Sequence, residues 1–212
     1  MEHPNLKEKI SKTFFEDKAV NVAENLLGTL LVNKEHGLSG LIVETEAYLG
    51  EKDPSCHLAR NREDRNKIFY KGAGTVYVFK IYYHHNLNFI TEHNGYPEGV
   101  LVRAIEPVKG LEEMKHVRET GEGTEIGSGP GKLTEALKIN KEHHNGLALS
   151  ESSISVYKTS LSDFKVCCTR RIGISKAESW PLRFHIGENP HVSKNLESSR
   201  NSFDHEKFYR DL

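Results

Sequence analysis

The stretch LIVETEAYL, residues 41–49, has the apolar composition of a buried strand but carries two glutamates. Successive side chains of a strand point to opposite faces, so Glu44, Glu46 and Tyr48 share one face with Ile42. A carboxylate on a core strand is costly unless it is paired or reaches a cavity. The pattern leaves two interpretations: one face of the strand meets solvent, as in many antiparallel sheets, or it lines a site.

Similar patterns predict the other elements. The segment KAVNVAENLL has a helical apolar stripe, with Asp17 as a capping residue before it and Gly28 after it. The stretch from residue 50 to 67 is polar and turn-rich. β-Branched and aromatic runs predict strands at residues 75–83, 86–91, 99–107, 154–158 and 182–186. Helices are predicted at residues 109–120 and 130–140. We therefore expect one α+β domain with a mostly antiparallel sheet.

Length and composition bound the class of protein. A chain of 212 residues with 36% hydrophobic and 28% charged residues suits one well-filled globular core. No run of about 18 apolar residues is present, and the first residues lack a signal-peptide pattern, so we expect no membrane partner and no export. Cys56 and the adjacent Cys167 and Cys168 make a poor disulfide framework, which favours a reducing, cytoplasmic setting.

The net charge of −1 gives no global sign of a nucleic-acid partner, but cationic residues cluster locally. Residues 57–83 carry six basic and two acidic side chains, and residues 165–183 carry five basic and one acidic. Each cluster by itself is explained by solvated surface. If the two segments converge in space, they form a basic face on a neutral protein.

Several chemistries lack their motifs in this chain. There is no GxGxxG, no P-loop and no HExxH, and the cysteines and histidines lack zinc-site spacing. We therefore predict no metal and no cofactor, with a metal-dependent hydrolase that uses the Cys/His pairs as an alternative. A set of other residues suits an enzyme that holds a planar heterocycle and activates water. These residues are Glu46, Tyr48, His57, the aromatic residues of 77–83, Asn88 and Arg103.

Six segments follow one another along the chain: IVETEAYLG, DPSCH, RNKIFYKGAGTVYVF, VLVRAIEP, GSGPGKLTEAL and WPLRF. Together and in this order they resemble the alkyladenine (3-methyladenine) DNA glycosylase family. The resemblance covers roughly residues 14 to 194, and VETEAY with RAxEP and SGPxKL at matching spacings is its most specific part. It implies a single compact domain, with a curved antiparallel sheet and surrounding helices, over residues 1–194. A polar extension then occupies residues 195–212.

The resemblance also implies roles for individual residues. Glu46 matches the glutamate that activates the attacking water, and Arg103 matches an arginine near that water. The base-binding positions correspond to Tyr48, His57, Phe79, Asn88 and Ile172. Tyr82 matches the side chain wedged into the duplex where the nucleotide leaves the stack. For contacts with phosphates we expect Arg60, Arg62, Arg65, Lys71 and Lys132.

Departures from the family pattern leave some of these assignments open. Phe79 stands where many members have tyrosine, so any hydrogen bond from that hydroxyl is absent. The segment YYHHNLN is one residue shorter than in some members. Asn86 therefore competes with Asn88 for the role of discriminating between purines, and Tyr83 competes with Tyr82 as the wedge.

The function implied is that of a monofunctional DNA glycosylase in base excision repair. It flips and hydrolytically excises alkylated or deaminated purines in double-stranded DNA, namely 3-methyladenine, 7-methylguanine, hypoxanthine and ethenoadenine. The resemblance favours Glu46 as the base, since alternation alone does not exclude Glu44. We expect a monomer that is cytoplasmic and nucleoid-associated in a bacterium, or nuclear in a eukaryote. A non-catalytic module that binds damaged nucleic acid on the same fold is the alternative.

Overall fold

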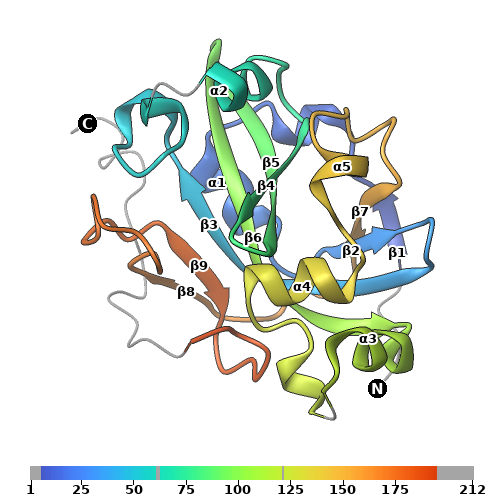
Figure 1. Cartoon of the computed structure of the whole chain (residues 1–212). Coiled ribbons are helices and arrows are strands. Elements are labelled where there is room, and N and C mark those ends of the chain that lie inside the picture. The colour runs from blue at the N-terminus through green and yellow to red at the C-terminus, as the bar shows by residue number, and fades with distance from the viewer. Residues whose placement is uncertain (1–5, 61–62, 121, 195–212) are drawn as a thin grey trace.

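The computed structural model describes residues 6–60, 63–120 and 122–194, with the backbone alone for Leu6 and residues 63–65. Nine strands in these ranges form one sheet, and every pairing in it is antiparallel (Figure 1). They are β1 (Leu6–Lys9), β2 (Leu30–Asn33), β3 (Leu38–Tyr48), β4 (Val76–Ile81), β5 (His84–His93), β6 (Tyr96–Lys109), β7 (Ile154–Thr159), β8 (Val166–Thr169) and β9 (Arg183–Ile186). The order is β1-β7-β2-β3-β6-β5-β4, and β8 joins through β9, which pairs with β3.

The helices of the described residues surround this sheet. They are α1 (Ala19–Asn25), α2 (Glu63–Phe69), α3 (Leu111–Arg118), α4 (Pro130–Ala136) and α5 (Lys141–His144). Short 3₁₀ helices are η1 (Lys12–Phe15), η2 (Gly50–Lys52), η3 (Leu58–Arg60) and η4 (Gly123–Glu125). Helix α1 packs against β3 and β6, and α4 packs against β5 and β6 (Figure 1). Among these helices none has the length and apolar character that a membrane span requires. The expected single α+β domain is confirmed, while the boundary near residue 194 stays a prediction.

Strand β3 is the centre of the sheet because both of its edges are paired. Strand β6 follows it along most of its length on one edge. The other edge is shared, since β2 pairs with residues 38–41 and β9 pairs with residues 44–46. Every residue of β3 except Tyr48 is consequently buried. The two glutamates therefore lie on a strand that is buried along almost its whole length.

The predicted elements agree with the structure where a strong local pattern is present. The segment HNGYPEG forms a hairpin between β5 and β6, with Asn94 and Gly95 at φ of 52° and 79°. Positive φ at both positions is the geometry that favours Asn-Gly in two-residue hairpins. The strand predicted at 75–83 ends at Ile81 instead, because the chain reverses at Tyr82 and Tyr83 to form the β4–β5 hairpin.

The segment from residue 50 to 67, predicted to be polar and turn-rich, also contains helical structure that the pattern did not indicate. It contains η2, η3 and the beginning of α2. Helix α2 begins at Glu63. The high polarity of the segment concealed this helix. Strand β8 was also missed, because its four residues are too few to show an alternation.

Gly50 fixes the path of the chain as it leaves β3. Its φ is +63°, and a Cβ at this position would lie 2.4 Å from the carbonyl oxygen of Pro97 on β6. Only glycine tolerates both the left-handed backbone and such a close approach. The loop from Leu49 to His57 is thereby held against the sheet, and this loop forms one wall of the site described next.

Candidate active site

The two glutamates of β3 are both completely buried, and neither face of the strand meets solvent. Of the two interpretations of the pattern, the solvent-facing one is therefore wrong. Burial of two carboxylates demands compensating partners. Each glutamate has such partners: Arg103 contacts both, and the other partners differ.

Glu44 is surrounded by donors. Its Oε1 accepts hydrogen bonds from the Nε of Arg103 at 3.0 Å and the Nε of Arg183 at 2.6 Å. The amide and hydroxyl of Ser193 donate to its two carboxylate oxygens at 2.7 and 2.9 Å. Burial alone would raise the pKa of Glu44, but the charges of Arg183 and Arg103 and the Ser193 amide hold the pKa below its ordinary value.

Glu46 has a different set of partners. The backbone amide of Ile172 donates to its Oε1 at 2.8 Å, and the hydroxyl of Tyr48 donates to its Oε2 at 2.9 Å. Nη1 of Arg103 lies 3.3 Å from Oε1 and 3.4 Å from the carbonyl oxygen of Ile172. Burial and the charge of Glu46 raise the pKa of Tyr48 well above its ordinary value, so the hydroxyl stays a donor.

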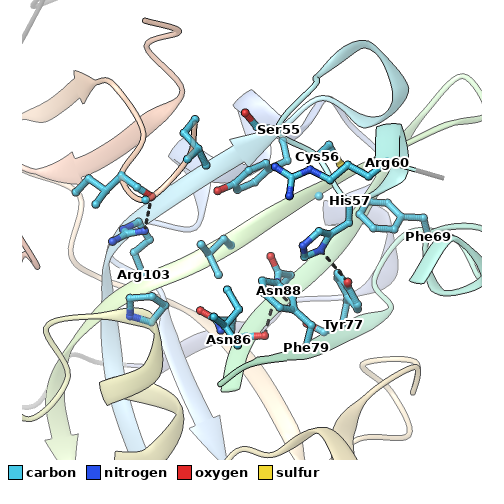
Figure 2. Close-up of a pocket in the computed structure, with 18 residues that line it drawn as sticks. Ser55, Cys56, His57, Arg60, Phe69, Tyr77, Phe79, Asn86, Asn88 and Arg103 are labelled. Carbon is cyan, nitrogen blue, oxygen red and sulfur yellow. Dashed lines mark hydrogen bonds between the residues drawn. The ribbon is translucent and has the colours of Figure 1, made fainter. Parts of the chain in front are cut away.

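A cavity of about 310 Å³ opens beside Glu46. This volume lies at the lower end of the range for small-molecule sites. Three partners of Glu46, namely Tyr48, Arg103 and Ile172, line it, while Glu46 itself lies behind them. Arg103 is at one end of the cavity, and Phe69 and Tyr77 are at the other (Figure 2).

Aromatic rings and a histidine form the far end of the cavity. Nδ1 of His57 and the hydroxyl of Tyr77 are hydrogen-bonded at 2.9 Å (Figure 2). The ring of Phe79 meets the edge of His57 with centroids 4.5 Å apart. Strand β4 supplies Tyr77 and Phe79, whereas His57 comes from the loop after β3. The structure thus brings together the predicted base-binding residues Tyr48, His57, Phe79 and Ile172 around one cavity.

Asn86 and Asn88 on β5 both line the cavity, and both are 6% exposed. The side-chain amide nitrogen of Asn88 donates to the carbonyl oxygens of Tyr77 and Asn86, at 3.3 and 3.2 Å. These bonds orient the Asn88 side chain. Burial and position therefore do not separate the two asparagines, and the assignment of Asn88 stays a prediction.

The β4–β5 hairpin carries an exposed aromatic tip next to the cavity. Tyr82 is 88% exposed and Tyr83 is 89% exposed, and the preceding Ile81 lines the cavity. Tyr82 has a φ of 51°, which is uncommon for a residue other than glycine. The two adjacent tyrosines therefore project from the surface at the end of the hairpin. Either tyrosine has the exposure that the predicted wedge requires.

The predicted phosphate-binding residues have different surroundings. Arg60 is exposed and borders the cavity. Nζ of Lys71 donates to the Gly146 carbonyl at 2.8 Å, and Lys132 is paired with Glu125. Arg62 and the side chain of Arg65 lie outside the described residues.

Among the residues that the structure describes, no group of three or more His, Cys, Asp or Glu side chains could hold a metal ion. All three cysteines are buried and unlinked. Cys56 lines the cavity, and burial raises the pKa of its thiol to about 12, so it is a neutral wall residue.

Tyr77, one of the aromatic residues in the predicted set, is hydrogen-bonded to His57 through its hydroxyl. Sequence reasoning missed two buried groups around the site. Arg183 was counted as surface charge, but it is completely buried against Glu44. Arg171 was counted in the same way, and it forms a buried ion pair with Asp53. The alternation of LRFHI was a usable signal for Arg183, because it places Arg183 and His185 on one face.

Comparisons with known proteins show the family of this chain. The model of the methylpurine-DNA glycosylase family matches residues 13–190. A protein of Prosthecochloris aestuarii named "Putative 3-methyladenine DNA glycosylase" is 40% identical over 191 residues, which are 88% of this chain and 91% of that protein. A protein of the same name from Francisella tularensis is 43% identical over 184 residues, 84% of this chain and 94% of the relative. The chain therefore belongs to the methylpurine-DNA glycosylase family of DNA-repair enzymes, which hydrolyse the N-glycosidic bond of a damaged base in DNA.

Proposed function

We propose that this glycosylase flips a damaged purine out of double-stranded DNA and hydrolyses its N-glycosidic bond with a water molecule activated by Glu46. The lesions are 3-methyladenine, 7-methylguanine, hypoxanthine and ethenoadenine, and the protein acts as a monomer without a lyase step. The observation that carries the proposal is the convergence of Glu46, Arg103 and the Ile172 carbonyl at one end of a cavity whose other end is aromatic.

The attacking water is placed by these three groups. The contacts of Arg103 Nη1 with Glu46 and Ile172, at 3.3 and 3.4 Å, are longer than an ordinary hydrogen bond. A water molecule beside these three groups, on the cavity side, accepts from Arg103 and donates to the Ile172 carbonyl and the Glu46 carboxylate. Glu46 takes its proton as the bond to the sugar breaks. The same carboxylate stabilises the positive charge that develops on the sugar.

The flipped base occupies the aromatic part of the cavity. Tyr48 and Phe79 offer flat faces for stacking, and the backbone amide of His57 reads the edge of the base. Alkylation at N3 or N7 makes the purine cationic and a better leaving group. Such lesions need less assistance from an acid than neutral hypoxanthine or ethenoadenine.

The exposed tip of the β4–β5 hairpin fills the gap that the flipped nucleotide leaves. Flipping costs a few kcal/mol, and a stacked aromatic side chain offsets about 1–3 kcal/mol of it. Tyr82 is our first choice for the wedge and Tyr83 the second. Arg60 beside the cavity contacts a phosphate, and Lys71 and Lys132 do so by exchanging their present partners. Arg62 and Arg65 complete the proposed set.

The test is single-turnover base release by the parent protein and by Glu46→Gln, on duplexes with hypoxanthine or ethenoadenine and on methylated DNA. We expect the parent to leave strands with abasic sites that break only after alkali. Glu46→Gln removes the general base, so release should fall by about 10² to 10⁴-fold. Glu98→Gln is the matched control, because Glu98 is another buried carboxylate, accepts a hydrogen bond from the Ala19 amide of α1 and does not line the cavity.

Two outcomes contradict the proposal. Release that survives in Glu46→Gln would assign the base to another residue. No release by the parent, together with tight binding of damaged duplex, would favour a non-catalytic binding module.

A further inference from the structure

A buried ion pair that the proposed mechanism does not use lies behind the wall of the cavity. Arg171 is 3% exposed, and Asp53 is completely buried. Nη1 and Nη2 of Arg171 donate to the two carboxylate oxygens of Asp53, the second bond being 3.0 Å long. This two-pronged arrangement fixes the plane of the guanidinium. It joins positions 118 residues apart in the chain.

The guanidinium covers one face of Tyr48. Cζ of Arg171 lies over the Tyr48 ring, 4.6 Å from its centroid, and 5.9 Å from that of Trp180. Tyr48 lines the cavity, but Arg171 does not. One face of the ring therefore bears a cation, and the other face is left for a base. The contact has cation–π geometry, which is attractive and directional.

The same pair fixes the backbone on both sides of the site. Arg171 also donates to the carbonyl of Ala47 at 3.0 Å, next to Tyr48. Asp53 accepts from the amides of Leu49 and Ser55 at 3.3 and 2.9 Å, which ties down the loop after β3. The residue after Arg171 is Ile172, whose amide and carbonyl contact Glu46 and Arg103.

Stability alone is a poor explanation for this pair. Replacing a buried ion pair with apolar residues is often neutral or stabilising, because desolvation opposes the attraction of the charges. In the described part of the chain, Nε of Arg171 has no hydrogen-bond partner, which adds to the cost. The pair is better explained by the position of its neighbours. Arg171 contacts the ring of Tyr48 and directly precedes Ile172 in the chain.

We propose that Arg171, held by Asp53, is a positioning residue that sets the plane of Tyr48 and the place of the Ile172 backbone. Base stacking and the contact of Ile172 with Glu46 then depend on one ion pair. The inference rests on the proposed function, since it assigns the flipped base to the open face of Tyr48.

The experiment compares the parent with Arg171→Lys and with the double variant Arg171→Met, Asp53→Asn, which leaves no unpaired buried charge. The readouts are thermal unfolding, affinity for undamaged duplex, ethenoadenine fluorescence in the complex before release, and single-turnover rate at saturating protein. The matched control is Arg118→Met, which breaks an ion pair between α3 and α4, away from the cavity.

At temperatures where all variants are folded, the double variant should retain its affinity for undamaged duplex. It should lose the fluorescence change of the stacked base, and its rate should fall by about 10²-fold, the effect of a misplacement of about 1 Å. Arg171→Lys keeps a cation but lacks the planar guanidinium group. Its rate should therefore lie between the rate of the parent and that of the double variant. Arg118→Met should match the parent in the fluorescence change and in the single-turnover rate.

A folded double variant with the parental fluorescence change and rate would overturn the inference, as would a loss of rate that follows only the folded fraction. Failure of the proposed function is a separate outcome, because the parent itself would then release no base.

Discussion

Glu44 and Glu46 are the same residue type on one strand, and both are fully buried, yet their surroundings differ. Glu44 accepts four hydrogen bonds, from Arg103, Arg183 and both polar groups of Ser193. Glu46 is held by an amide and a tyrosine hydroxyl, with one guanidinium nitrogen at a longer distance. All residues that hold Glu46 line the cavity, while Arg183 and Ser193 do not.

The two glutamates differ in whether their hydrogen-bond partners can also contact a ligand or a water molecule. Glu44 is fixed by groups from packed elements, and its ionised state is part of the fold. Glu46 contacts the walls of a cavity, where a ligand or a water molecule can join the same groups. Arg103 links the two carboxylates, since its Nε bonds to Glu44 and its Nη1 faces Glu46 and Ile172. Burial alone therefore does not distinguish a structural carboxylate from a candidate catalytic one, whereas the difference in their partners does: those of Glu46 all line the cavity.

Glu44→Gln should separate the two glutamates most clearly. The amide leaves Arg183 and part of Arg103 buried without a counter-charge, so the free energy of unfolding should fall by about 3–5 kcal/mol. Glu46→Gln should lose less stability, because its amide oxygen still accepts from the Ile172 amide and its NH2 group donates to the Tyr48 hydroxyl, which rotates to accept. Urea unfolding of the two variants and the parent measures the difference. Equal losses of stability would remove the distinction between a structural and a catalytic carboxylate.

Tyr48→Phe should sharpen the description of the Glu46 region. The change keeps the stacking face and removes the hydroxyl that donates to Oε2 of Glu46. A hydrogen bond to a charged group is worth about 1.5–3 kcal/mol, so the single-turnover rate should fall by about 10- to 100-fold. Tyr157→Phe on β7, outside the cavity, is the control. A parental rate in Tyr48→Phe would show that the hydroxyl does not orient Glu46.

The local sequence pattern and the family resemblance together predicted the strands that carry the site, but not the buried residues that hold those strands and loops in place. Alternation placed Glu46 and Tyr48 on one face of β3, and they are hydrogen-bonded in the structure. The glycine-rich hairpin between β5 and β6 was likewise predictable, because Asn-Gly encodes its turn. Both features depend on neighbours in the sequence.

Arg171 shows why the rest was not predictable. Arg170 and Arg171 are adjacent; the first is exposed and the second is buried. Most of the segment from residue 170 to 182 has no regular structure, so no periodicity indicates which of the two points inward. Its partner Asp53 is far away in the sequence, within a polar stretch that was assigned to turns. Such long-range pairs become visible only when the fold brings the segments together.

The smallest predicted effect is the dependence of stability on pH. The pKa of Glu44 is lowered in the folded state from an ordinary value of 4.5. The stabilisation is therefore complete above about pH 4.5, and it is lost as the pH falls through the lower folded pKa. In this window the parent should lose up to about 1.4 kcal/mol of unfolding free energy per pH unit from this group.

Glu44→Gln lacks this contribution, so its stability should approach that of the parent as the pH falls below 4.5. Glu113 is a useful control, since Lys138 also lowers its pKa but the pair is exposed. Salt screens an exposed pair, so at high ionic strength Glu113→Gln should keep the parental pH dependence. If the unfolding free energy of Glu44→Gln changed with pH as steeply as that of the parent, Glu44 would not be the buried anion that stabilises the fold. The contrast between the two glutamates would then rest on Glu46 alone.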